Sequence, residues 1–392
     1  NRYLEDVARA NKLICNIDLV TDNSLTTAER AQYKAEAKMF RAMVMFDMVR
    51  LWGDFPVITT VADDITSENI DEVYPQYFPK QNTELEAYQQ IEKDLLDAVL
   101  YAPDNTPGNK TLFTKSVART LLAKIYAEKP LRDYTKVIQY CDEVKADGFD
   151  LVDDFSDLFG MNAAGTDAKM RNTKESILEA QFTSGAGNWC TWMFGRDLVN
   201  WNNNFTWAKW VTPSRDLISA FKQEGDEVRF KESIVYYDCN WSNYYPSDNY
   251  PFMYKCRSAN SSIIKYRYAD VLLLKAEALI MQDTPDLEGA ADIIDKVRDR
   301  AKLGALPTSV RSNKNAMLNA LLKERRLELA FEGQRWFDLV RLDKVEEVMN
   351  AVYAKDSGRK AQIYTFDKNS YRLPIPQSVI DANDKIHQNP GY

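Results

Sequence analysis

The sequence contains very few of the residues on which most catalytic and metal sites depend. Its single histidine, His387, lies five residues from the end of the chain. Catalytic triads and histidine-bearing metal sites are therefore nearly excluded. The cysteines are few, odd in number and widely spaced, with no C-x-x-C pair: Cys15, Cys141, Cys190, Cys239 and Cys256. This pattern predicts neither a disulfide framework nor a zinc site, so we expect buried free thiols and no metal or cofactor.

Long apolar runs, basic stripes and helix breakers are also scarce. No stretch reaches the roughly 18 apolar residues that a membrane span requires. The 50 Lys and Arg are interspersed with 58 Asp and Glu, which argues against nucleic acid as a partner. Only 14 glycines and 14 prolines occur in 392 residues, so long segments can be helical. The first residues, NRYLEDVARAN, are typical of a helix interior, and we expect any targeting or lipidation signal upstream of them.

The apolar periodicity of the chain predicts helices. Apolar residues recur at steps of four and three at Ala35, Met39, Ala42, Phe46 and Val49. This spacing predicts a helix with one buried stripe, which Gly53 and Pro56 end. A second helix is predicted near residues 84 to 100, with Pro103 and Pro107 beyond its end.

Residues 116 to 146 predict a pair of antiparallel helices, and a similar pair appears later in the chain. A shift of 153 residues aligns Leu121 with Leu274, Ala123 with Ala276, Asp133 with Asp286, Tyr134 with Leu287 and Val144 with Val297. Small residues where the two arms cross, and an Asp before the second arm, indicate tetratricopeptide-like hairpins.

A segment dense in aromatic residues separates the two hairpins. Residues 189 to 254 hold 17 of the 46 aromatic residues, six of the eight tryptophans and seven asparagines. Three prolines punctuate the segment, so we expect loops, short helices and a hairpin. Sugar rings stack on indole and phenol faces, and their hydroxyls pair with amide groups. The candidate ligand-binding residues are therefore Trp192, Trp207, Trp241, Tyr244, Trp201, Asn203 and Asn243.

Two of these patterns also have simpler structural explanations. The rings of the aromatic segment would equally fill a small core beneath the loops, which for any single tryptophan is at least as good an explanation. Residues 321 to 344, LLKERRLELAFEGQRWFDLVRLDK, place charges around one apolar helix face. A phosphate site is one interpretation, but pairing of acids and bases three or four residues apart on the helix surface explains them better. The same holds for Arg267 and Asp270.

Five stretches, in this order, resemble the SusD/RagB family. They are KAEAKMFRAMVMFDMVRLWGDFPVIT (34–59), YRYADVLLLKAEAL (266–279), DKVRDRAKL (295–303), the charged stretch 321–344 and the ending YRLPIPQSVIDANDKIHQNPGY (371–392). The resemblance extends along nearly the whole chain. The aromatic segment itself matches no family motif, so no ligand contact is carried over.

The resemblance implies an all-α body of tetratricopeptide-like helix pairs with a loop-rich ligand-binding insertion. One SusD-like domain is expected over residues 1–392, with hairpins over 28–150, the aromatic insertion over 151–262, a second hairpin with further helices over 263–345, and a C-terminal segment over 346–392. The family has no catalytic activity. Its members are anchored by an N-terminal lipid to the outer face of the outer membrane in Bacteroidota, and a further N-terminal region is expected before this chain. They load substrate into a SusC-like TonB-dependent transporter.

The sequence leaves four possible functions open. The first is capture of an oligosaccharide for import, and the second is capture of a peptide by a RagB-like member of the same family. The third is a helical-repeat scaffold that binds only proteins. The fourth is an α-helical glycosidase, because the 58 acids offer many carboxylate pairs, although none has a catalytic context.

Overall fold

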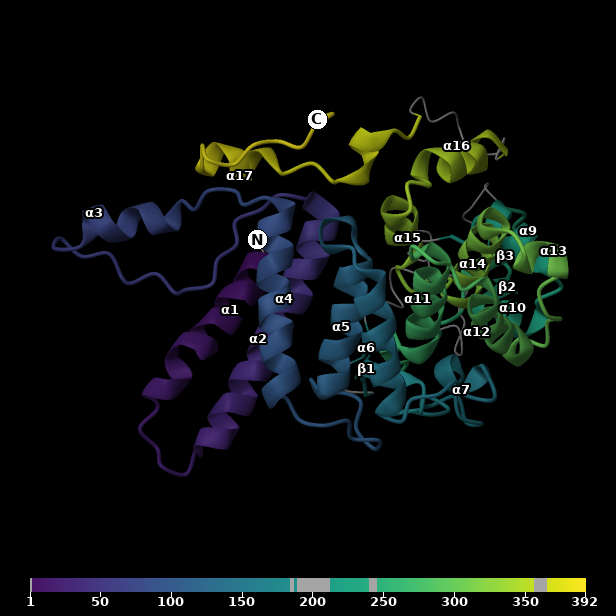
Figure 1. The fold of residues 1–392 in the computed structure, drawn as a ribbon, viewed down its shortest axis with the longest axis horizontal. Helices are drawn as coiled ribbons and strands as arrows, with labels where there is room; N and C mark the ends of the chain where they lie inside the picture. Colours follow the sequence, from purple (N-terminus) through teal and green to yellow (C-terminus); the bar gives the residue numbers. More distant parts are fainter. Residues whose placement is uncertain (1, 184–186, 189–211, 240–244, 356–364) are drawn as a thin grey trace. The chain divides into compact units, whose positions relative to one another are not determined.

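Helices dominate the computed structural model, which describes residues 2–183, 187–188, 212–239, 245–355 and 365–392 (Figure 1). This confirms the mainly helical fold predicted from the sequence. In the described part of the chain, no helix is both long and apolar enough to cross a bilayer. The chain forms two compact units, one of Asn1–Asn105, Phe113–Glu143 and Phe366–Tyr392, the other of Thr106–Leu112 and Val144–Thr365. The domain boundaries expected from the sequence stay predictions.

The first unit is built around long helices that lie side by side (Figure 1). Its elements are α1 (Arg2–Asn16), η1 (Ile17–Leu19), α2 (Thr27–Trp52), α3 (Ile70–Val73), η2 (Tyr74–Tyr77), α4 (Glu84–Tyr101), α5 (Lys115–Ala127), η3 (Lys129–Leu131), most of α6 (Tyr134–Ala146), η4 (Lys368–Tyr371) and α17 (Gln377–Ala382). Helix α2 packs against both α1 and α4, and α4 packs in turn against α5.

Helix α2 follows closely from its sequence. The Thr26 hydroxyl accepts a hydrogen bond from the Glu29 backbone N–H, and the Glu29 carboxylate accepts one from the Thr26 N–H, which is a capping box. All five positions of the predicted apolar stripe are buried. Gly53 ends the helix at a φ of 74°, a conformation that glycine adopts without strain. The predicted helix and its end are confirmed, as is the helix over residues 84 to 100.

The second unit contains two small antiparallel sheets among its helices. Its elements after α6 are α7 (Ser156–Phe159), β1 (Ser176–Ala180), α9 (Arg215–Glu224), α10 (Glu227–Ser233), β2 (Ile234–Tyr237), β3 (Tyr250–Met253), β4 (Ile263–Arg267), α11 (Tyr268–Met281), α12 (Leu287–Arg300), α13 (Thr308–Arg311), α14 (Lys314–Glu328), α15 (Arg335–Arg341) and α16 (Val345–Lys355). Strand β1 pairs with β4, and β2 with β3. Strand β4 continues directly into α11, twelve of whose 14 residues are buried, and α12 and α14 pack on that helix.

The two predicted hairpins repeat the same hydrogen bonds at the same offset of 153 residues. The Asp133 N–H donates to the Tyr126 carbonyl at 2.9 Å, and the Asp286 N–H donates to the Leu279 carbonyl at 2.9 Å. The Asp133 carboxylate accepts from the Lys136 N–H at 3.1 Å, and the Asp286 carboxylate accepts from the Gly289 N–H at 2.9 Å. In both hairpins the Asp therefore closes the turn and caps the second helix. The internal repeat predicted from the sequence is confirmed.

Two local expectations are corrected by the structure. Cys15 is exposed rather than buried, whereas Cys141 and Cys239 are buried and Cys256 is half-buried; all four are free thiols. The stretch 321–344 is not one helix, because α14 ends at Glu328 and α15 begins at Arg335. Phe331 and Gly333 between them have φ values of 66° and 74°, so the chain turns there and the expected single face is divided.

Candidate ligand-binding site

All seven residues predicted to bind the ligand lie outside the described part of the chain. They are Trp192, Trp201, Asn203, Trp207, Trp241, Asn243 and Tyr244. Their assignment therefore stays a prediction. The described remainder of the same aromatic segment forms helices α9 and α10 and the hairpin of β2 and β3, as the expectation of short helices and a hairpin stated.

Helix α9 supplies one wall of a pocket in the second unit. The Ser214 hydroxyl accepts a hydrogen bond from the Leu217 N–H at 3.1 Å and so caps the helix. The helix ends at Gly225, which has a φ of 69°. Its apolar side packs into a small core with β2 and α14, made of Leu217, Ile218, Phe221, Ile234, Leu327 and Ala330. Residues 215, 218, 219 and 222 are spaced for one face of the helix, and all four line the pocket.

The β2–β3 hairpin supplies the opposite wall. Its register pairs Ile234 with Met253 and Tyr237 with Tyr250, which brings residues 236 and 245–249 opposite α9. The Tyr245 hydroxyl donates to the Pro213 carbonyl at 2.8 Å, next to the start of α9. The hydroxyls of Thr212 and Tyr250 lie 2.6 Å apart. These contacts hold the hairpin connection against the beginning of α9.

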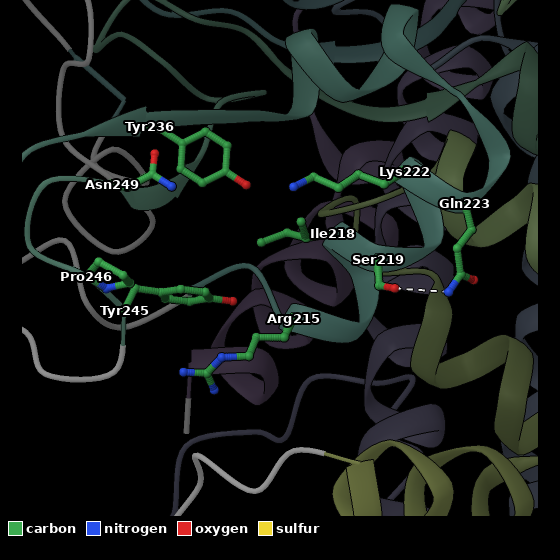
Figure 2. Close-up of a pocket in the computed structure, with 9 residues that line it drawn as sticks. All are labelled: Arg215, Ile218, Ser219, Lys222, Gln223, Tyr236, Tyr245, Pro246 and Asn249. Carbon is green, nitrogen blue, oxygen red and sulfur yellow. Dashed lines mark hydrogen bonds between the residues drawn. The ribbon is translucent and has the colours of Figure 1, made fainter.

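The pocket between these walls has a volume of about 460 Å³, within the range of small-molecule sites (about 300 to 1,000 Å³). Helix α9 contributes Arg215, Ile218, Ser219, Lys222 and Gln223, and the hairpin contributes Tyr236, Tyr245, Pro246 and Asn249. The Arg215 guanidinium lies 4.8 Å from the centre of the Tyr245 ring. Figure 2 shows the Tyr236 hydroxyl and the Lys222 ammonium turned toward each other, with the Asn249 amide beside the Tyr236 ring. All nine lining residues belong to the aromatic segment 189–254.

The chemistry of the pocket combines aromatic surface with hydrogen-bonding groups. Burial raises the pKa of Tyr236 above its usual value. Its hydroxyl is protonated at neutral pH, as tyrosine ordinarily is, and can both donate and accept. The lining residues include two cations, two amides and two hydroxyl-bearing tyrosines, but no carboxylate. Such a pocket can stack a flat apolar face and hydrogen-bond the groups around its edge.

The described rings of the aromatic segment divide between core and pocket. Phe221, Tyr250 and Phe252 are buried in the small cores under α9 and the hairpin. Tyr236 and Tyr245 are half-buried and face the pocket. The core explanation therefore holds for the first three rings, and contact of the aromatic segment with a ligand stays a prediction.

The charged stretch 321–344 forms buried ion pairs with other elements instead of surface pairs along its own helix. Glu328 of α14 is the centre of one cluster, where its carboxylate contacts the guanidinium groups of Arg229, Arg267 and Arg300. A second cluster, made of Arg325, Asp270, Asp338, Arg341 and Glu277, joins α14 and α15 to α11. The structural interpretation of these charges, including Arg267 and Asp270, is confirmed, but the expected position on the surface is wrong.

The electrostatics of the Glu328 cluster explain how charges survive burial there. Although burial opposes ionisation, the three guanidinium groups around Glu328 hold its pKa well below the usual value. Lys255 shows the opposite balance, because burial outweighs its contact with Glu332 and lowers the Lys255 pKa to about 8. Since the Glu328 carboxylate is fully buried and paired, it offers no surface to a phosphate or a glycan.

The residues that line the described pocket were not singled out by sequence reasoning. Tyr245 and Asn249 follow the predicted Trp241, Asn243 and Tyr244 closely, so the segment carried a signal but the individual positions did not. Arg215 and Lys222 had no signal beyond their seven-residue spacing. Across the described residues, no group of three or more His, Cys, Asp or Glu side chains could hold a metal ion.

Comparisons with family models and with known proteins agree on one family. A family model described as "SusD family" matches residues 248–392, and one described as "Starch-binding associating with outer membrane" matches residues 1–127. The two segments do not overlap, and together they cover more than half of the chain. SusD-like protein P2 of Formosa agariphila is 28% identical over 98% of this chain and 78% of its own length.

Solved structures share the fold along the whole chain. A laminarin binding SusD-like protein superposes with a TM-score of 0.75 at 24% identity, over all of this chain and 84% of the other. Surface glycan-binding protein A from Bacteroides thetaiotaomicron, solved in complex with laminarihexaose, superposes with a TM-score of 0.76 at 20% identity, over 99% of this chain and 84% of the other. The family models, the curated relative and the shared helical fold agree, and the chain belongs to the SusD-like family.

Proposed function

We propose that this protein captures an oligosaccharide in the pocket between α9 and the β2–β3 hairpin and delivers it to a SusC-like TonB-dependent transporter. The observation that carries the proposal is the composition of the pocket wall. All nine lining residues come from the aromatic segment, and they place tyrosine rings beside guanidinium, ammonium and amide donors. This is the combination of stacking faces and edge donors that a pyranose ring requires.

Family membership supports the glycan as ligand and the transporter as partner. Two solved relatives carry laminarin or laminarihexaose in their names, and a matching family model is described as starch-binding and associated with the outer membrane. The protein would act on the outer face of that membrane, anchored through an N-terminal lipid. Trp192, Trp201, Trp207 and Trp241, which lie outside the described residues, are also predicted to contact the oligosaccharide.

The proposed activity is binding without turnover. In the charged stretch, Glu324 and Glu328 are fully buried and paired with arginine, so neither is placed to protonate a glycosidic oxygen. Conversion of the bound sugar, abolished by a single Asp or Glu substitution, would contradict the proposal and support the glycosidase instead.

Calorimetric titration with a panel of oligosaccharides that includes laminarihexaose tests the proposal. Binding to at least one glycan is expected, and Lys222→Ala should weaken it about tenfold, because an ammonium donor to a bound hydroxyl is lost. Lys231→Ala is the matched control, since Lys231 is an exposed lysine on α10 that does not line the pocket. Asn249→Ala tests the hairpin wall in the same way.

Substitution of the predicted tryptophans extends the experiment. Trp207→Ala and Trp241→Ala should each weaken binding of the same glycan. If no glycan binds, and peptides bind with the same dependence on Lys222, the peptide-capturing function replaces the proposed one. If no small ligand binds, the protein-binding scaffold replaces it.

A further inference from the structure

A second concavity, in the first unit, is larger than the pocket beside α9 and differs from it in chemistry. It is a groove of about 860 Å³ between the start of α1, the end of α2, the segment 77–81 and helix α17. Five aromatic rings line it: Tyr3, Trp52, Phe55, Tyr77 and Phe78. Aliphatic and proline side chains make up most of the remaining wall. The rings of Tyr3 and Trp52 meet edge to face with their centres 5.4 Å apart.

The polar groups of the groove are mostly engaged within the wall itself. The Gln81 side chain donates to the carbonyls of Asp54 and His387 and accepts from the His387 N–H. The Asn383 amide donates to the Pro79 carbonyl at 2.8 Å and accepts from the Lys385 N–H at 3.1 Å. Few donors and acceptors remain for sugar hydroxyls, so the groove suits an apolar anchor better than a glycan.

The same hydrogen bonds fix the shape of the groove before anything binds. They tie the C-terminal segment around α17 to residues 78–81, and the Asn389 amide adds a bond to the Trp52 carbonyl at 2.8 Å. Phe55 and Asn82 also pair as an isolated antiparallel bridge. A wall of this kind needs little ordering on association, which favours binding.

The arm that leads into the groove, residues 57–80, is acidic and apolar at once. It extends away from the long helices of its unit and carries α3 and η2 (Figure 1). The arm holds five acids, Asp63, Asp64, Glu68, Asp71 and Glu72, against one base, Lys80 at its end. All five are exposed. The same arm exposes large apolar side chains, namely Val61, Ile65, Ile70, Tyr74 and Tyr77.

We propose that the groove and the acidic arm together dock a protein partner, through a segment in which an aromatic or long aliphatic side chain is flanked by lysine or arginine. The apolar side chain enters the groove against Trp52 and Tyr77, and the basic residues face the carboxylates of the arm. In protein interfaces, buried apolar anchors commonly supply most of the affinity, and complementary charges at the rim supply specificity and faster association. The proposal is independent of glycan capture, which uses a different unit of the chain.

The test uses fluorescence anisotropy with a labelled peptide, Lys-Lys-Trp-Leu-Lys-Lys, and the whole chain. Two comparison peptides replace the lysines by glutamate or the Trp-Leu pair by alanines. We expect the first peptide to bind and both comparison peptides to bind at least about tenfold more weakly. Raising the salt concentration from about 0.05 to about 0.5 M should weaken binding of the first peptide severalfold, because exposed charges are screened.

Two pairs of variants locate the binding. The double variant Asp63→Lys with Asp64→Lys should weaken peptide binding about tenfold. The double variant Asp283→Lys with Asp299→Lys makes an equal charge change at exposed sites of the other unit and should leave peptide binding unchanged. Ala382→Trp fills the groove from an exposed position and should abolish binding. Ala8→Trp adds the same side chain at an exposed position of α1 outside the groove and should not.

Three results would overturn the proposal. These are equal binding of the glutamate peptide, unchanged binding by Ala382→Trp, and self-association of the chain that Ala382→Trp abolishes, since the groove would then hold a second copy. Glycan binding by the Ala382→Trp variant, measured in parallel, should match the unmodified protein and keeps this test separate from that of the proposed function.

Discussion

The two units treat charge and apolar surface in opposite ways. Of the large apolar side chains that are exposed in the described residues, sixteen lie in the first unit and two in the second. Of the charged side chains that are buried in the same part of the chain, five lie in the first unit and seventeen in the second. The hairpins repeat the same turn, so the difference arises from what surrounds them. The first unit leaves apolar surface for contact, whereas the second uses buried ion pairs to join its helices and sheets around the pocket.

Removal of the Glu328 carboxylate should cause the largest loss of stability, and it tests most clearly whether buried ion pairs hold the second unit together. Glu328→Gln leaves the guanidinium groups of Arg229, Arg267 and Arg300 with an incomplete set of carboxylates. We expect a loss of about 3 to 5 kcal/mol in the free energy of unfolding, measured by chemical denaturation, because the desolvation of these cations is no longer offset. Glu288→Gln is the control. Its carboxylate contacts Arg311 but is largely exposed, so the loss should stay below about 1 kcal/mol. Equal losses in the two variants would show that burial gives the cluster no special weight.

The buried ammonium of Lys255, which pairs with Glu332 beside that cluster, should make the stability of the protein depend on pH. Its pKa falls from the ordinary 10.5 to about 8 because the ammonium is buried. Between these two values the unfolded chain binds more protons than the folded chain, so the stability contributed by this group rises as the pH rises. The total rise is about 3 kcal/mol over the window from pH 8 to pH 10.5. Lys255→Met should remove that slope, and Lys231→Met, at an exposed position, should keep it. A slope that is the same in both variants would contradict the assignment.

The smallest effect tests the similarity of the hairpins themselves. Asp133→Ala and Asp286→Ala each remove a carboxylate that caps the second helix of its hairpin. Each should lower the free energy of unfolding by about 1 kcal/mol, which thermal or chemical denaturation can measure. A large loss at one Asp and none at the other would mean that the repeat is one of sequence and geometry only.

The parts of the fold that the sequence predicted are those set by local rules. The apolar stripe, the capping threonine and Gly53 of α2 all act within a few residues of one another, and the hairpin turns are closed by a nearby Asp. The burial of the charges on α14 could not be predicted in the same way. Acids and bases three or four residues apart have the same spacing on a solvated face and in a core. Only the packing of α11, with its apolar surface on nearly every side, decides that this face is enclosed.

The candidate site depends on longer-range structure for the same reason. Lys222 and Asn249 come together because the β2–β3 register places the hairpin connection opposite α9. No periodicity of either segment encodes that register. The density of aromatic and asparagine residues was enough to indicate the segment, and the described pocket lies within it. The individual tryptophans predicted from that density stay predictions.

Glycan capture by the second unit is tested most directly by the position of a bound sugar. A crystal structure with the tightest-binding oligosaccharide of the panel would give it. We expect a sugar ring stacked against Tyr245, with its hydroxyls within hydrogen-bonding distance of Lys222 or Asn249. An oligosaccharide bound elsewhere, with the pocket between α9 and the β2–β3 hairpin empty, would contradict glycan capture at this site.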